Sequence, residues 1–125
     1  MADEGVSPWL VEPIPDTDQL FKRIHRKLFK PDGRIMTGAF EHTEMSVDWS
    51  RYSTPAETQQ REGNAAENAV VNLSVAEVRR IPGQTVGHTP KKGNRSHSHV
   101  KGKKNAEAKM RLRDAAEIVL RVPLQ

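Results

Sequence analysis

The sequence contains no cysteine, few aromatic residues and no long hydrophobic run. Without cysteine it has no disulfide, no thiolate metal site and no cysteine nucleophile, which suits the reducing cytoplasm, where we expect the protein to act. No stretch approaches the ~18 consecutive apolar residues that a transmembrane helix requires, so we expect no membrane partner. The acidic start, residues 1–5, also lacks the apolar segment of a secretory signal.

Length and composition indicate one small domain. The 125 residues leave no room for two independent cores, and a hydrophobic share of 35% predicts a modest one. Charged residues make up 29% of the chain, an ordinary share for a folded domain. The net charge of +4 favours a polyanionic partner such as nucleic acid, although the same charge also serves solubility alone.

Positive charge is concentrated between residues 89 and 113. This stretch holds nine of the 20 lysine and arginine residues and a single acid, Glu107, so it carries +8 within a chain of +4. Because basic side chains neutralise backbone phosphates, we predict that residues 88–113 bind RNA or DNA. The candidate phosphate-binding residues are Lys91, Lys92, Arg95, Lys103, Lys104 and Arg111.

Two histidines within this basic stretch are separated by one residue. His97 and His99 belong to a segment, residues 96–100, that fits a β-strand. Side chains two positions apart on a strand project from the same face, so both imidazoles and Lys101 would reach one site. A base, an acid and a cation are what metal-independent ribonuclease chemistry needs. His97, His99 and Lys101 are therefore candidate catalytic residues, and simple phosphate contact by the histidines is the alternative.

A metal site is a third use for such a histidine pair. The sequence contains no H-E-x-x-H motif and no Cys/His ligand spacing. The basic residues on both sides of the pair would also repel a cation. We therefore expect neither a metal ion nor any other cofactor.

Capping residues and apolar periodicity predict four helices. Two capping boxes begin at Thr54 and Ser74, and Asn105 can cap a last helix. The spacing of apolar residues after Asp16 predicts a first helix with a basic outer surface. The predicted helices cover residues 17–29, 55 to about 63, 75 to about 81, and 106–120.

Short apolar segments predict five strands. Met45, Val47 and Trp49 alternate with polar residues, which is typical of a half-buried strand. The predicted strands are residues 35–40, 45–49, 69–73, 84–88 and 96–100, the first two as a hairpin around 41–44. Together these elements predict a single α+β domain over residues 16–125, in which a short mixed sheet is packed by the N-terminal and C-terminal helices.

Residues 1–15 form a separate feature of the sequence. Pro8, Pro13 and Pro15 exclude a helix and predict an extended arm, with loose polar residues at its start. Trp9 and Leu10 are expected to tether this arm to the domain or to a partner. The alternative function is therefore a non-catalytic interaction subunit of a bacterial multi-protein system, of the toxin–antitoxin or defence type, whose arm docks a larger protein.

Several blocks of the sequence resemble segments shared by a family of small bacterial hypothetical proteins. The family has no assigned activity, so the resemblance implies a bacterial cytoplasmic protein and adds nothing about mechanism. It extends over about residues 20–113. The blocks are residues 20–24, 32–35 with 39–40, 44–49 with 54–55, and 99–104.

Overall fold

A computed structural model of the chain describes residues 7–123. In this part of the chain, six strands form one antiparallel sheet in the order β4-β5-β2-β1-β3-β6. The strands are β1 (Gln19–His25), β2 (Glu44–Trp49), β3 (Asn68–Ser74), β4 (Thr85–His88), β5 (His97–Lys101) and β6 (Glu117–Leu120). The α-helices are α1 (Pro55–Arg61), α2 (Val75–Arg79) and α3 (Ala106–Ala115). Short 3₁₀ helices are η1 (Arg26–Leu28), η2 (Thr37–Phe40) and η3 (Ala65–Glu67).

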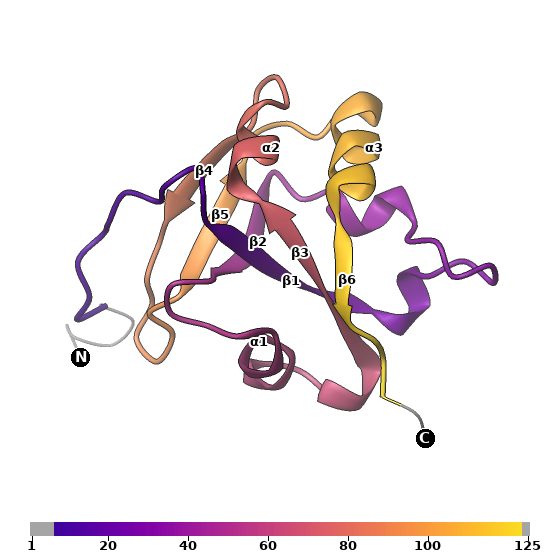
Figure 1. The fold of residues 1–125 in the computed structure, drawn as a ribbon, viewed down its shortest axis with the longest axis horizontal. Coiled ribbons are helices and arrows are strands. Elements are labelled where there is room, and N and C mark those ends of the chain that lie inside the picture. The colour runs from indigo at the N-terminus through magenta and orange to yellow at the C-terminus, as the bar shows by residue number, and fades with distance from the viewer. Residues whose placement is uncertain (1–6, 124–125) are drawn as a thin grey trace.

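The helices lie on both faces of the sheet. Figure 1 shows α2 and α3 on one side of the strands and α1 on the other. The main core lies between the sheet, α2, α3 and η2, and it includes the fully buried Trp49, Phe40, Leu20, Met45, Leu73 and Leu112. On the other face α1 packs on β1, β3 and β6. The predicted α+β class is confirmed, but the sheet is antiparallel and not mixed.

The predicted N-terminal helix over residues 17–29 is wrong, because residues 19–25 form the central strand β1. Leu20 and Ile24 point into the main core, and Phe21 is buried on the opposite face under α1. A strand buried on both faces does not alternate cleanly between apolar and polar residues. Lys22 also stands on the core side of the strand, between Leu20 and Ile24, so a charged residue interrupts the two-residue alternation of apolar residues. The apolar positions that remain have the spacing typical of a helix.

Two further predictions of secondary structure are wrong. Residues 35–40 contain the 3₁₀ helix η2 and no strand, and β2 pairs with β1 and β5, so no hairpin forms around residues 41–44. The last helix ends at Ala115, and residues 117–120 form the edge strand β6 against β3. Local periodicity does not reveal this second change, since the pairing partner of β6 lies far away in the sequence.

The remaining elements agree with the prediction. Thr54 and Glu57 form a reciprocal capping box at the start of α1, and Ser74 and Asn105 cap α2 and α3. Gly102 ends β5 with φ of 144°, where a Cβ atom would collide with the carbonyl oxygen of Gly83. Such a backbone conformation and close approach require glycine.

The arm differs from the body of the domain. Residues 7–15 contain no helix or strand, and the polar residues 1–6 that we predict to be loose lie outside the described residues. Ile14 is buried in the core, whereas Leu10 and Val11 are 85% and 72% exposed. Across residues 7–123, no helix has the length and apolar character that crossing a lipid bilayer demands.

Candidate nucleic-acid interface

The structure places His97 and His99 on one face of β5, as the sequence predicts. Their ring centroids are 4.9 Å apart in an edge-to-face arrangement. Opposite them on β2 stand Asp48, paired with His97, and Ser46, paired with His99. Because directly paired residues point to the same side of a sheet, these four side chains share the face on which α1 packs, mainly over β1, β3 and β6.

Both ring nitrogens of His97 are engaged by the protein. Its Nδ1–H donates to the carbonyl oxygen of Thr89 at 2.9 Å, and its Nε2 lies 3.3 Å from the hydroxyl of Ser46. A carbonyl can only accept, so the proton of the neutral ring belongs on Nδ1 and Nε2 accepts from Ser46. Burial lowers the pKa of His97, and the bond to Thr89 opposes this only in part. The ring is therefore held in a neutral, structural state.

His99 and Lys101 continue the same face toward solvent. Burial lowers the pKa of His99, with Glu44 opposing and Lys91 adding to the effect. The ammonium group of Lys101 lies 3.7 Å from the carboxylate of Glu44, and both side chains are exposed. His99 and Lys101 are thus accessible to a ligand, in contrast to His97.

Asp48 organises the inner end of this site. It is 4% exposed and accepts hydrogen bonds from Thr58 on α1 at 2.9 Å, Arg61 on α1 at 3.2 Å and Asn94 at 3.0 Å. These contacts attach α1 and the loop at 89–96 to the sheet beside His97. The pocket between them has a volume of ≈ 10 Å³, room for about one water molecule.

The third histidine of the basic region does not join the pair. His88 is paired with Ser98 and therefore points to the opposite face of the sheet from His97 and His99. Its Nε2–H donates to the carbonyl oxygen of Arg95 at 2.7 Å, and its Nδ1 accepts from the backbone N–H of Glu12 at 2.9 Å. His88 therefore connects the arm to the β4–β5 loop.

Among residues 7–123, no helix covers the outer part of the histidine face. Its residues on β2, β4 and β5 are Glu44, Ser46, Thr85, Gly87, His99 and Lys101, which we call the open face. Lys91 and Lys92 are exposed in the β4–β5 loop at one end of β5, and Lys103 is exposed just beyond the other end. These three predicted phosphate-binding residues therefore lie near the two ends of the strand that carries His99, and Lys91 is close enough to His99 to affect its pKa.

Lys104 is bound within the chain, whereas its neighbour Lys103 is exposed. The ammonium group of Lys104 donates to the carbonyl oxygens of Thr43, Val100 and Gly102 at 3.2, 3.0 and 2.8 Å. Burial lowers its pKa to about 8. Because all three protons of the ammonium are used within the chain, Lys104 stabilises the end of β5 and has none left for phosphate.

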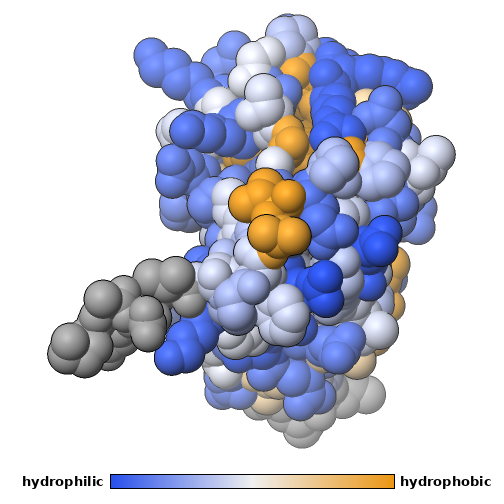
Figure 2. Space-filling view, turned by 90° about the vertical axis from the view of Figure 1, so that its left-hand side faces the viewer, coloured by the Kyte–Doolittle hydropathy of each residue, from blue (hydrophilic) through white to orange (hydrophobic). Residues whose placement is uncertain are grey.

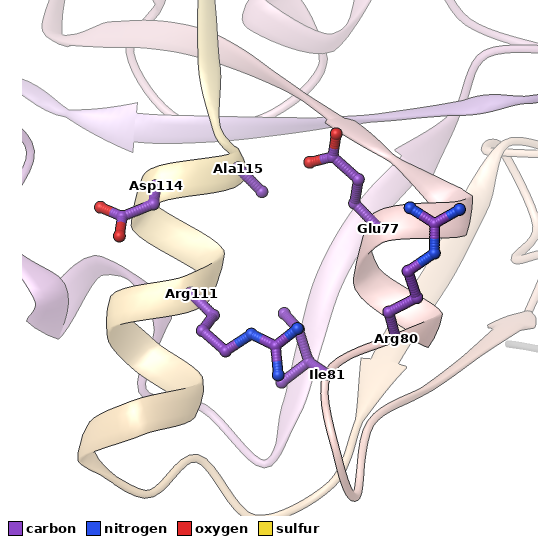
Figure 3. A pocket seen from close by; sticks show the side chains of 6 residues that line it. All are labelled: Glu77, Arg80, Ile81, Arg111, Asp114 and Ala115. Atoms are coloured by element: carbon purple, nitrogen blue, oxygen red, sulfur yellow. The ribbon is translucent and has the colours of Figure 1, made fainter.

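Arg111 lies apart from the other candidates. It stands on α3, at a groove of ≈ 400 Å³ whose other wall is α2. Figure 3 shows its guanidinium reaching across this groove toward Ile81, whereas Asp114 points away from it. The basic residues that are contiguous in the sequence thus separate onto different sides of the fold.

Arg95 belongs to a second cluster that the sequence does not reveal. Its guanidinium lies between the rings of Trp9, at 4.7 Å, and Tyr52, at 4.1 Å. The hydroxyl of Tyr52 donates to Glu12 at 2.6 Å, and Arg51 lies 5.4 Å from the centre of the Tyr52 ring. Arg95 is separated from Trp9 and Tyr52, and Tyr52 from Glu12, by 40 residues or more in the chain, so no local pattern could indicate these contacts.

Within residues 7–123, no group of three histidine, cysteine or acidic side chains has the arrangement of a metal site. Comparisons of the chain with protein-family models, curated proteins and solved structures gave no match. The resemblance to a family of small bacterial proteins therefore stays a prediction.

Proposed function

We propose that the chain binds nucleic acid across the open face and the β4–β5 loop. The observation that carries the proposal is an uncovered polar sheet surface with exposed lysines at both ends. Lys91 and Lys92 stand at one end and Lys103 at the other, separated by the length of β5, about 17 Å. An extended single strand can place its phosphates at both ends while its bases lie over the sheet between them.

The site supports binding more than cleavage. Acid–base cleavage of RNA needs one imidazole neutral and the other protonated. The pKa values of His97 and His99 are both lowered by burial, so neither ring is charged to a useful extent at neutral pH. His97 also uses both nitrogens within the protein, and the adjoining pocket is too small for a reacting phosphate.

The test is a salt titration of RNA binding. Fluorescence anisotropy of a labelled single-stranded RNA of about 12 nucleotides should give an affinity that falls as salt rises, because bound lysines release counterions. In the variant Lys91→Gln/Lys103→Gln, the slope of log affinity against log salt should decrease by roughly 1.4, or about 0.7 for each lost contact.

Arg111→Gln is the matched control for the single variants Lys91→Gln and Lys103→Gln, since each of the three removes one positive charge, but Arg111 stands on α3, away from the open face. The proposal is wrong if wild-type protein binds no RNA at low salt. It is also wrong if Arg111→Gln weakens binding as much as either single lysine variant does.

A protein partner that docks on the arm is the second candidate function. Leu10 and Val11 are the most exposed large apolar residues in the described part of the chain. Figure 2 shows an orange hydrophobic patch surrounded by hydrophilic surface on the side of the molecule where the arm lies. If a partner binds there, Leu10→Ser/Val11→Ser should lose it in a pull-down while RNA binding is retained. Val119→Ser, at the far edge of the sheet, is the control.

A further inference from the structure

The arm places the carboxylate of Glu12 close to two arginine side chains. Glu12 accepts a hydrogen bond from Tyr52 and lies 3.9 Å from the guanidinium of Arg51 and 3.7 Å from that of Arg95. The hydrogen bond from Tyr52, with smaller contributions from Arg51 and Arg95, lowers the pKa of Glu12. The carboxylate is therefore ionised at neutral pH and balances one of the two positive charges.

The carboxylate does not satisfy the donors around it. Both arginine distances exceed hydrogen-bonding range, and Arg51 directs its Nε–H to the Tyr52 hydroxyl at 2.9 Å. Within residues 7–123 the guanidinium of Arg95 donates no hydrogen bond. Arginine pairs best with planar or tetrahedral oxyanions through two parallel N–H groups, and a phosphate presents more oxygens than a carboxylate does.

The outer arm is also lightly attached. Ile14 anchors its base in the core, and Arg79 donates to the Ile14 carbonyl oxygen at 2.7 Å. Beyond Ile14, Leu10 and Val11 remain exposed, so little apolar burial holds that segment. Its attachments are the polar contacts of Glu12 and the stacking of Trp9 on Arg95. Polar contacts and one ring contact, rather than apolar burial, therefore hold residues 7–12 in place.

We propose that Arg51, Tyr52 and Arg95 form a phosphate-binding site that Glu12 occupies as an internal competitor. A phosphate of bound nucleic acid takes the place of the Glu12 carboxylate, and the outer arm is released. Arg95 belongs to the β4–β5 loop that also carries Lys91 and Lys92, so the site shares this loop with the surface assigned to nucleic acid. Tyr52 stacks on His88, which points away from the open face, so a strand bound there reaches Arg95 around the loop. The ligand's identity rests on the proposed function, but the competition by the arm is a separate claim.

The competition predicts a gain in affinity on removal of a negative charge. RNA should bind to Glu12→Gln at least about fivefold more tightly than to wild-type protein, because the state in which residue 12 occupies the phosphate site is weakened. Adding Arg95→Gln to Glu12→Gln should abolish the gain, because the cation that receives the phosphate is lost.

Glu117→Gln is the matched control. It makes the same change of charge at an exposed position of β6, at the opposite edge of the sheet. Its affinity for the labelled RNA should equal that of the wild type. Thermal unfolding of each variant checks that the domain remains folded.

The outcomes separate the two proposals. If wild-type protein binds RNA and Glu12→Gln binds no better than Glu117→Gln, the competition is refuted and the proposed function stands. A gain that survives Arg95→Gln refutes the phosphate site, since it would then reflect net charge alone. If neither wild type nor Glu12→Gln binds RNA, the proposed function fails, and the further inference fails with it.

Discussion

Replacing Lys22 by methionine should stabilise the fold. Lys22 lies on the central strand β1, between Leu20 and Ile24 and opposite Val71, on the face that packs against α2 and α3. No hydrogen bond or ion pair within residues 7–123 involves its ammonium group. Burial lowers its pKa from 10.5 to about 8, and neighbouring Arg23 adds a smaller effect in the same direction.

The size of the effect follows from the pKa. A lowering from 10.5 to about 8 corresponds to about 3 kcal/mol that opposes folding while the lysine is charged. Methionine keeps an unbranched, flexible side chain and has no charge to desolvate. We therefore expect the free energy of unfolding at pH 7 to rise by about 2–3 kcal/mol, and the Tm by roughly 6–12 °C.

The same pKa predicts a pH dependence. In the unfolded chain Lys22 keeps its proton up to about pH 10.4, whereas in the folded protein it loses the proton above about pH 8. The penalty is thus complete below pH ~8 and is relieved between pH ~8 and ~10.4, so wild-type stability should gain a contribution over that range. Lys22→Met should lack this contribution, and the two proteins should converge in stability at alkaline pH.

Urea unfolding followed by the fluorescence of the buried Trp49 measures both effects. Wild type, Lys22→Met and the exposed-lysine control Lys27→Met would be compared at neutral pH and at a pH of about 9.5. Lys27→Met should change stability by less than about 0.5 kcal/mol. Equal or lower stability of Lys22→Met at neutral pH, or an unchanged difference at alkaline pH, would refute the reasoning.

Three further outcomes test the site. Lys104→Met should cost about 1–2 kcal/mol in thermal unfolding because three carbonyl oxygens lose their donor, while Lys103→Met should stay within about 0.5 kcal/mol. Asp48→Ala should cost at least about 2 kcal/mol, and the exposed Asp32→Ala much less; similar losses would mean that the buried carboxylate organises nothing. Since the pKa of His97 is lowered in the folded state, wild-type stability should fall as pH drops below about 6.5, and His97→Gln should show a shallower fall in urea unfolding.

Local chemistry predicts much of this fold. Thr54, Ser74 and Asn105 begin helices through hydrogen bonds made within three residues, so their effect can be derived from the sequence alone. The alternation of Met45 and Val47 likewise identifies β2, because only one face of that strand enters the core. The side-by-side placement of His97 and His99 follows from the same two-residue repeat.

Long-range contacts decide what local chemistry cannot. Residues 19–25 become a strand because β2 and β3 pair with both edges of the segment, which overrides an apolar spacing typical of a helix. Pairing with β3 likewise turns residues 117–120 into β6. Helix propensity differs by less than about 1 kcal/mol per residue, and burial in a sheet outweighs it.

By itself, then, the sequence determined the starts of α1, α2 and α3, four of the six strands, the basic loop and the shared face of His97 and His99. Tertiary structure alone decided which basic groups remain free: Lys104 is enclosed by carbonyl oxygens, whereas Lys103 beside it stays exposed. It also brought Glu12 to Arg95, 83 positions further along the chain. The reason is physical: charge and periodicity are properties of neighbouring residues, but the partners of a side chain depend on how distant segments pack together.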